Sequence, residues 1–240
     1  MSNWKVVMNN KIVVYWSCLE EEALRAQEPS SIYNQILLKK STKENGLLFC
    51  PSFKEYTKNI YGIHSIYDYE FMIEDSLVFS KKYDQKFYDN HMVVRSAEEK
   101  LFSFCQRFIF FTEEDELLMS ANMQPFFEDN SISERCMLIP GMFDIGKWFR
   151  NIDFAFYLKN NFNIFTISEG DIFQYIKFYT NKRIVFKQFF MDDFLNQQHQ
   201  YVLDSKNHRI QKQYRGLSPY YQMSKNKNKI IKAIKNNLVD

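Results

Sequence analysis

The chain has 240 residues, of which 45% are hydrophobic and 18% aromatic, including 24 Phe and 15 Tyr. This apolar content is enough to bury a core without metals or disulfides, which excludes a globally disordered chain and favours one large domain. The 31 Lys and Arg residues nearly balance the 29 Asp and Glu residues, so the net charge of +2 excludes a uniformly basic or acidic protein.

The cysteines give no sign of a metal site or a disulfide framework. Cys18, Cys50, Cys105 and Cys136 are far apart and form no CxxC pair, so we expect reduced thiols. The longest apolar runs are far shorter than the roughly 18 residues that a membrane-spanning helix needs. The first residues contain no apolar stretch typical of a secretory signal, and we therefore expect a cytoplasmic protein.

In the first half of the chain, several short segments have the period of two that is typical of strands. In residues 67–74, aromatic and aliphatic residues alternate with Asp, Glu and Met. Four phenylalanines, at positions 102, 104, 108 and 110, share one face of another candidate strand. Two further strands are predicted at residues 11–17 and 91–95, and a helix at residues 31–40.

The strongest strand pattern lies in residues 147–191. It predicts four strands that are separated by short turns, and these are residues 152–158, 163–167, 172–179 and 183–190. Because the connections are too short for parallel crossovers, we expect consecutive strands to pair as an antiparallel meander. A helix is predicted at residues 192–203. About eight strands in some 200 residues predict a mainly β fold, an antiparallel β-sandwich or jelly-roll-like domain with a few peripheral helices and a C-terminal helix.

Residues 206–240 form a basic tail that differs in composition from the β-rich domain expected over residues 1–205. The tail holds nine Lys and Arg residues and one acid, a net charge of +8, against −6 for the rest of the chain. Ser218 and Pro219 are typical of a helix start, and Ile230, Ile234 and Leu238 recur at helical spacing.

The basic tail has three interpretations. It contacts a nucleic acid, another polyanion or a membrane surface weakly, it docks on an acidic protein partner, or it is a solvated helix that covers the core. Its candidate polyanion contacts are Lys225, Lys227, Lys229, Lys232 and Lys235.

Residues 140–150 are the least ordinary segment, because they concentrate two of the six glycines with aromatic and charged residues. Asp144, Lys147, Trp148 and Arg150 are candidate binding residues for an anionic ligand, with Trp148 as a stacking surface. The competing interpretation is a structural corner, in which glycines make the turn and Asp144 pairs locally. The segment matches neither of the usual phosphate-loop motifs, GxxxxGK[ST] and GxGxxG.

Catalytic signatures are absent from the sequence. The four histidines, His64, His91, His199 and His208, stand alone without the spacing of a metal site, and neither a metal nor another cofactor is predicted. No GxSxG motif or familiar cysteine nucleophile occurs, so no catalytic residue is assigned. The sequence does not exclude a catalytic pair of carboxylates that come close together only in the folded protein.

One part of the chain, residues 108–178, resembles a known group of proteins. The similarity rests on Phe-Ile-Phe-Phe at 108–111, Asp-Glu-Leu-Leu at 115–118, Gln-Pro-Phe-Phe at 124–127, the segment 139–150, Phe-Ala-Phe at 154–156 and Ser-Glu-Gly-Asp at 168–171. These elements resemble uncharacterised β-rich proteins of tailed bacteriophages. The resemblance implies a viral setting, and no activity or catalytic residue comes with it. The turn at Gly170 and the strand after it are similar, by analogy only, to the closing hairpin of dUTPases.

The sequence therefore favours a phage-encoded accessory or structural binding protein that is not an enzyme. Its binding surface would be the corner at residues 141–150 or the basic tail. The alternative is a small-molecule or nucleotide-processing enzyme on a dUTPase-like or jelly-roll β-fold. An enzyme should show a cavity with at least two convergent ionisable groups. We expect the protein in the host cytoplasm or associated with the virion, with an unidentified protein partner.

Overall fold

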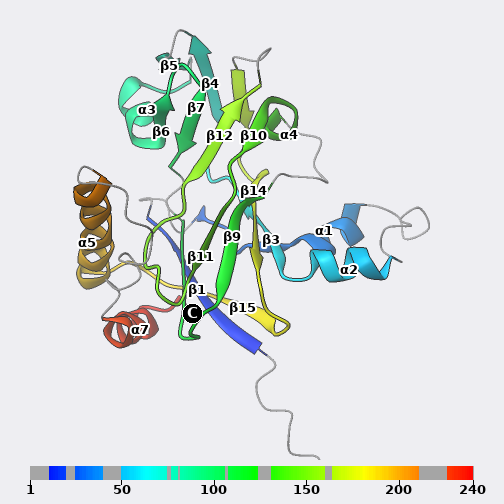
Figure 1. Ribbon diagram of the computed structural model, residues 1–240, viewed down its shortest axis with the longest axis vertical. Coiled ribbons are helices and arrows are strands. Elements are labelled where there is room, and N and C mark those ends of the chain that lie inside the picture. Colours follow the sequence, from blue (N-terminus) through cyan, green and yellow to red (C-terminus); the bar gives the residue numbers. More distant parts are fainter. Residues whose placement is uncertain are drawn as a thin grey trace, which may run out of the picture.

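The computed structural model describes residues 11–19, 25–39, 50–74, 77–80, 82–105, 108–123, 131–159, 164–210 and 226–239. Its strands form four mainly antiparallel sheets around a shared core, and its helices lie at the periphery (Figure 1). The predicted fold class, mainly β with a C-terminal helix, is confirmed.

The first sheet has the order β15-β1-β8. Its strands are β1 (Lys11–Cys18), β8 (Phe108–Thr112) and β15 (Arg183–Gln188). β1 pairs parallel with β15 and antiparallel with β8. Every side chain of β8 is buried, because one face of the sheet contacts the main core and the other a second core beneath two helices. Burial on both faces explains why this strand is a continuous apolar run.

The second sheet has the order β11-β9-β14-β3-β2, and the two cavities described below lie along it. Its strands are β2 (Ser30–Ser31), β3 (Ile60–His64), β9 (Leu118–Met123), β11 (Gly141–Asp144) and β14 (Ile172–Phe178). Helices α1 (Ile32–Lys39) and α2 (Pro51–Thr57) cover part of one face, where Ile32 and Phe53 pack on Ile60 and Tyr175. The same face continues past α2 over β14, β9 and β11.

Two further sheets form the other end of the molecule, at the top of Figure 1. One has the order β10-β12-β7-β6 and the other β13-β4-β5. The strands of the first are β6 (Met92–Ser96), β7 (Leu101–Phe104), β10 (Cys136–Leu138) and β12 (Phe154–Leu158). Those of the second are β4 (Tyr69–Glu74), β5 (Leu77–Phe79) and β13 (Ile164–Ile167). Short helices α3 (Gln85–His91) and α4 (Ser131–Arg135) flank them.

Aromatic rings join the sheets into one core. The Phe104 ring lies 4.4 Å from the Tyr69 ring, edge to face, and the Phe156 ring is stacked 5.0 Å from the Phe165 ring. The Phe154 ring contacts Phe173 of the second sheet at 5.5 Å. Phe154 and Phe156 are fully buried, so the core face predicted for this strand is confirmed.

The predicted antiparallel meander of consecutive strands in residues 147–190 is wrong. The four strands lie close to their predicted positions, but they belong to four different sheets, and each short connection carries the chain from one sheet to the next. Alternation reports which face a strand buries, whereas its partners are chosen by tertiary contacts between distant segments. Gly170 has the predicted positive φ, 84°, yet its turn joins two sheets and closes no hairpin. Likewise, the phenylalanines at 102–110 belong to two strands, β7 and β8, and not to one.

Two helices cover the outer face of the first sheet. α5 (Asp193–Ile210) extends beyond the predicted 192–203, and α7 (Lys227–Asn236) forms most of the described end of the chain. Ile230, Ile231 and Ile234 of α7 are buried against Phe111 and other residues of the second core. The predicted helix start at residues 218–219 lies outside the described residues. The apolar stripe of the basic tail thus packs on the protein itself.

Candidate functional site

The corner at residues 140–150 directs its charged groups at its own residues. The Asp144 carboxylate accepts a hydrogen bond from the Gly146 N–H at 2.9 Å and forms an ion pair with Lys147 at 3.0 Å. A side-chain hydrogen bond to Asp144, followed by the negative charge of that carboxylate, raises the pKa of the Lys147 ammonium. A Cβ atom at Gly146 would lie 2.2 Å from the Glu114 carbonyl oxygen, so only glycine fits there. Asp144 and Lys147 thus pair locally.

Arg150 and Trp148 are also engaged inside the corner. The Arg150 side chain is 6% exposed and pairs with Asp153 at 3.0 Å. Its guanidinium lies 5.4 Å from the centre of the Trp148 ring, which stacks on Phe143. The structure therefore brings all four corner candidates together, but in contacts with one another and with neighbouring residues that fix the shape of the chain.

The basic tail meets an acidic loop, residues 113–116, which joins β8 to β9. Lys227 donates to the Asp115 carboxylate at 2.7 Å, and Lys235 donates to the Glu113 carboxylate at 2.9 Å. The hydrogen bond from Lys227 lowers the pKa of Asp115. Partial burial raises the pKa of Glu113, but hydrogen bonds from Lys235 and Tyr15 outweigh it and bring the pKa below its ordinary value. Two of the predicted polyanion contacts are therefore paired within the chain.

The other three lysines of that set are placed differently. Lys229 and Lys232 are exposed on the solvent side of α7, and Lys225 lies outside the described residues. Lys229 and Lys232 lie one turn apart on α7 and, within the described part of the tail, are the two members of this set that no acidic side chain is shown to pair with.

A different surface combines exposed aromatic rings with a lysine, and the sequence did not point to it. Tyr56 of α2 and Tyr179, which follows β14, are both 48% exposed. The Lys177 ammonium lies between them, 4.6 Å from the centre of the Tyr56 ring and 5.7 Å from that of Tyr179. It also donates to the Tyr56 carbonyl at 3.0 Å, so the lysine holds both rings in place.

These rings border a groove of about 700 Å³, which we call the tyrosine groove. Its lining includes Tyr56, Lys58, Lys177, Tyr179, Thr180 and Asn181. Next to the groove, the Asn59 side-chain amide donates to the Thr180 and Lys182 carbonyls at 2.8 and 3.0 Å. Asn59 has φ 57°, a left-handed conformation that asparagine tolerates better than most residues. The α2–β3 turn is thereby tied to the β14–β15 turn.

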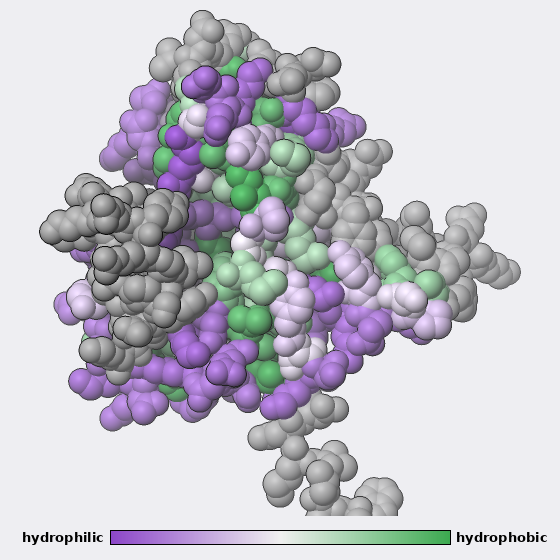
Figure 2. Space-filling model, in the orientation of Figure 1, coloured by the Kyte–Doolittle hydropathy of each residue, from purple (hydrophilic) through white to green (hydrophobic). Residues whose placement is uncertain are grey.

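The face of the second sheet that carries Lys177 also carries two exposed apolar side chains, Leu118 and Met142. Met142, Ser120 and Lys177 are neighbours in register on β11, β9 and β14, and they share one face. Met142 and Leu118 are 51% and 40% exposed, and the Tyr179 hydroxyl lies 3.4 Å from Ser120 Oγ. Figure 2 shows exposed apolar surface over β9. An extended ligand would find both flat apolar surface and cationic groups here.

None of the protein-family models, curated proteins and solved structures that we compared with the chain matches it. Within the described ranges, no helix is long and apolar enough to span a membrane, and no group of three or more His, Cys, Asp or Glu side chains is placed to share a metal ion.

A second cavity, of about 720 Å³, lies at the other edge of the same sheet. We call it the serine cavity, and its lining includes Glu28, Ser30, Gln35, Tyr61 and Arg183. Partial removal from water raises the pKa of Glu28, and burial raises the pKa of Tyr61. It thus holds the convergent ionisable groups expected of an enzyme. No motif in the sequence indicates this cavity, because its residues come from segments far apart in the chain.

Proposed function

We propose that this chain is a phage-encoded binding protein whose tyrosine groove takes a single-stranded nucleic acid. The observation that carries the proposal is the pair of half-exposed tyrosine rings beside the Lys177 ammonium, on a sheet face that also exposes Leu118 and Met142. Aromatic side chains beside lysines are the usual means by which proteins hold single strands without reading their sequence. A host cytoplasmic or virion location fits this role.

Stacking supplies most of the expected affinity. Each base that stacks on a tyrosine contributes about 1–3 kcal/mol, as measured by alanine substitution. Lys177 contacts both rings, and Asn59 ties down the backbone that follows Tyr179, so little side-chain freedom is lost on binding. The exposed Leu118 and Met142 extend the platform for further bases or sugars.

Electrostatic attraction contributes less to binding at the tyrosine groove than it would to binding at the basic tail. The groove offers Lys177 and Lys58, and Glu55 lies 3.8 Å from the Lys58 ammonium. One or two phosphate contacts predict a log-log salt slope of about 0.7 to 1.4 for a single strand. Binding through the several lysines of the basic tail would give a steeper slope, so the slope distinguishes the two surfaces.

The test is fluorescence anisotropy of a labelled oligo-dT with the full chain. Tyr56→Ala and Tyr179→Ala should each weaken binding by about 5- to 150-fold, the equivalent of one lost stacking contact. Lys177→Met keeps the aliphatic stem and should reduce both the affinity and the salt slope. Tyr201→Ala is the matched control, because Tyr201 is a 56% exposed tyrosine on α5, and it should leave binding unchanged.

Two results would count against the proposal. The intact protein could fail to bind oligo-dT at low salt. Alternatively, Lys229→Gln and Lys232→Gln could abolish binding while the groove variants keep it, which would move the site to the basic tail. Binding of an unstructured peptide in place of oligo-dT would identify the groove as a protein-docking surface.

A further inference from the structure

Ser30 and His64 form a hydrogen-bonded pair at the serine cavity. Ser30 Oγ lies 2.6 Å from His64 Nε2, and His64 Nδ1 lies 2.8 Å from the Gly170 carbonyl oxygen. The pairing of β2 with β3, which sets Ser30 opposite Gly62, brings the two residues together although 34 positions separate them. Ser30 is also one of the residues that line the cavity.

The Gly170 carbonyl selects the tautomer of the His64 ring. A carbonyl oxygen only accepts, so in the neutral form of the ring His64 Nδ1 carries the proton and Nε2 is the acceptor. The Ser30 hydroxyl therefore donates to Nε2. Gln35 Nε2 in turn donates to Ser30 Oγ and holds the hydroxyl in this orientation. The histidine is in the tautomer that a general base for a serine nucleophile needs.

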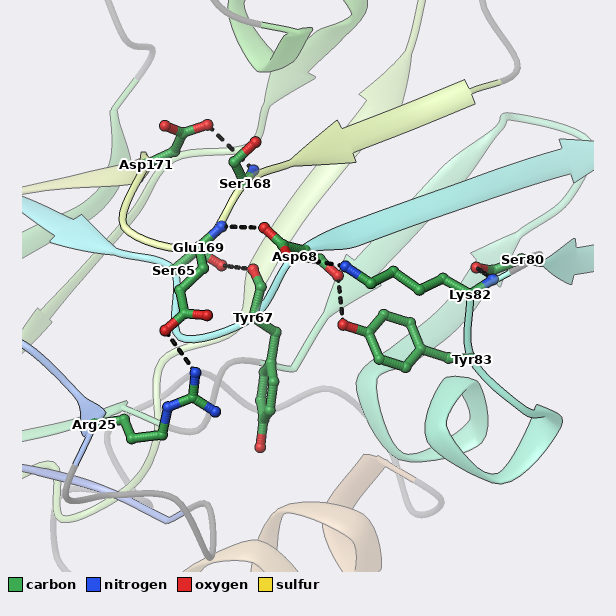
Figure 3. Close-up of polar contacts among 10 residues, drawn as sticks. All are labelled: Arg25, Ser65, Tyr67, Asp68, Ser80, Lys82, Tyr83, Ser168, Glu169 and Asp171. Atoms are coloured by element: carbon green, nitrogen blue, oxygen red, sulfur yellow. Dashed lines mark hydrogen bonds and ion pairs between the residues drawn. The ribbon is translucent and has the colours of Figure 1, made fainter.

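A separate network holds the turn that contains Gly170, and Figure 3 shows its contacts among Glu169, Asp68 and Lys82. The Gly170 N–H donates to the Ser65 carbonyl at 2.8 Å, and the Glu169 N–H donates to the Asp68 carboxylate at 2.7 Å. Lys82 pairs with the same carboxylate at 2.9 Å. The N–H of Glu169, followed by Lys82, lowers the pKa of Asp68. Asp68 is thus a positioning residue for the turn that orients His64.

We propose that Ser30 is a nucleophile, with His64 as its general base, and that the serine cavity takes a small polar carboxylic ester. The volume of about 720 Å³ suits a small-molecule ligand, and the lining supplies both charged and apolar contacts. This site is distinct from the tyrosine groove, so its failure would leave the nucleic-acid proposal untouched.

Water is the only other reactant that the proposed ester hydrolysis needs. The Ser30 hydroxyl gives its proton to His64 Nε2 as Oγ forms a bond to the ester carbonyl carbon, and the bond from that carbon to the alkoxy oxygen then breaks. His64 returns the proton to the departing alkoxide, which leaves as the alcohol. Water follows the same path, with its proton passing through His64, and releases the carboxylic acid and the free Ser30.

The first test is a fluorophosphonate probe, which phosphonylates a nucleophilic serine with loss of fluoride. Folded wild-type protein should acquire one adduct, and peptide mass spectrometry should place it on Ser30 and not on the adjacent Ser31. Ser30→Ala should abolish labelling, and His64→Gln should slow it at least tenfold. Ser96→Ala, on β6, is the control and should label like the wild type. Thermal melting confirms that each variant is folded.

The second test is release of p-nitrophenol from p-nitrophenyl acetate. Wild-type protein should show a burst that matches the labelled fraction, and Ser30→Ala should lose it. Asp68→Asn should slow labelling while the fold persists, as expected of a positioning residue. No adduct on the folded wild type, an adduct on Ser31, or equal labelling of the His64→Gln variant would overturn the proposal.

Discussion

The packing of α7 on the first sheet predicts which residues of the basic tail stabilise the fold. Ile234 is 0% exposed, and Ile230 and Ile231 are 2% and 7% exposed. Burial of each isoleucine is worth about 1.5–3 kcal/mol, so the three together contribute a large share of the 5–15 kcal/mol by which domains are usually stable. Ile234→Ala should therefore lower the free energy of unfolding by about 2–5 kcal/mol.

The ion pairs of the same helix should matter far less. Lys235 and Glu113 are about half exposed, and exposed pairs are typically worth about 0.2–1 kcal/mol. Urea unfolding followed by circular dichroism would compare Ile234→Ala with Lys235→Met, and Lys229→Ala, at an exposed position, serves as the control. A Lys235→Met variant less stable than Ile234→Ala would refute the account of α7 as an apolar clasp.

Three further predictions concern stability. Phe156→Ala should cost about 3–5 kcal/mol in urea unfolding, because the ring is fully buried, and an unmoved midpoint would contradict the core assignment. Gly146→Ala should destabilise the protein, since the added Cβ would lie 2.2 Å from the Glu114 carbonyl oxygen. An unchanged melting temperature would show that the backbone at residues 140–150 shifts to make room for the methyl group. The folded pKa of Glu113 lies below its ordinary value of 4.5, so its contribution is full above that pH and is lost as the pH falls through the folded value. Lys235→Met should flatten this acid dependence in melts between about pH 2 and 6, and an unaltered profile would count against the pair.

The positions of strands could be predicted from the sequence, but their partners could not. Phe154 and Phe156 alternate with Ala155 and Tyr157, and this pattern reports burial of one face. Nothing in it indicates that β12 lies between β10 and β7, because pairing is decided by contacts across distant segments. In β8 the sequence shows no alternation, because both faces of this strand are buried and apolar residues follow one another.

The candidate sites were harder to predict for a related reason. The corner at residues 140–150 drew attention through unusual residue types, yet those residues pair locally and shape the turn. The tyrosine groove joins Tyr56 to Lys177, which are 121 positions apart, and Ser30 meets His64 only through the pairing of β2 and β3. Neither constellation forms a motif along the chain, so only the folded arrangement reveals it.

Photo-crosslinking tests the central claim, binding of a single strand at the tyrosine groove, most directly. An oligonucleotide that carries 5-bromouracil would be irradiated with the full chain and the adducts located by peptide mass spectrometry. The account predicts crosslinks at Tyr56 or Tyr179, and their loss with excess unlabelled oligo-dT. Crosslinks confined to residues 227–236, or none above the level of a denatured control, would contradict it.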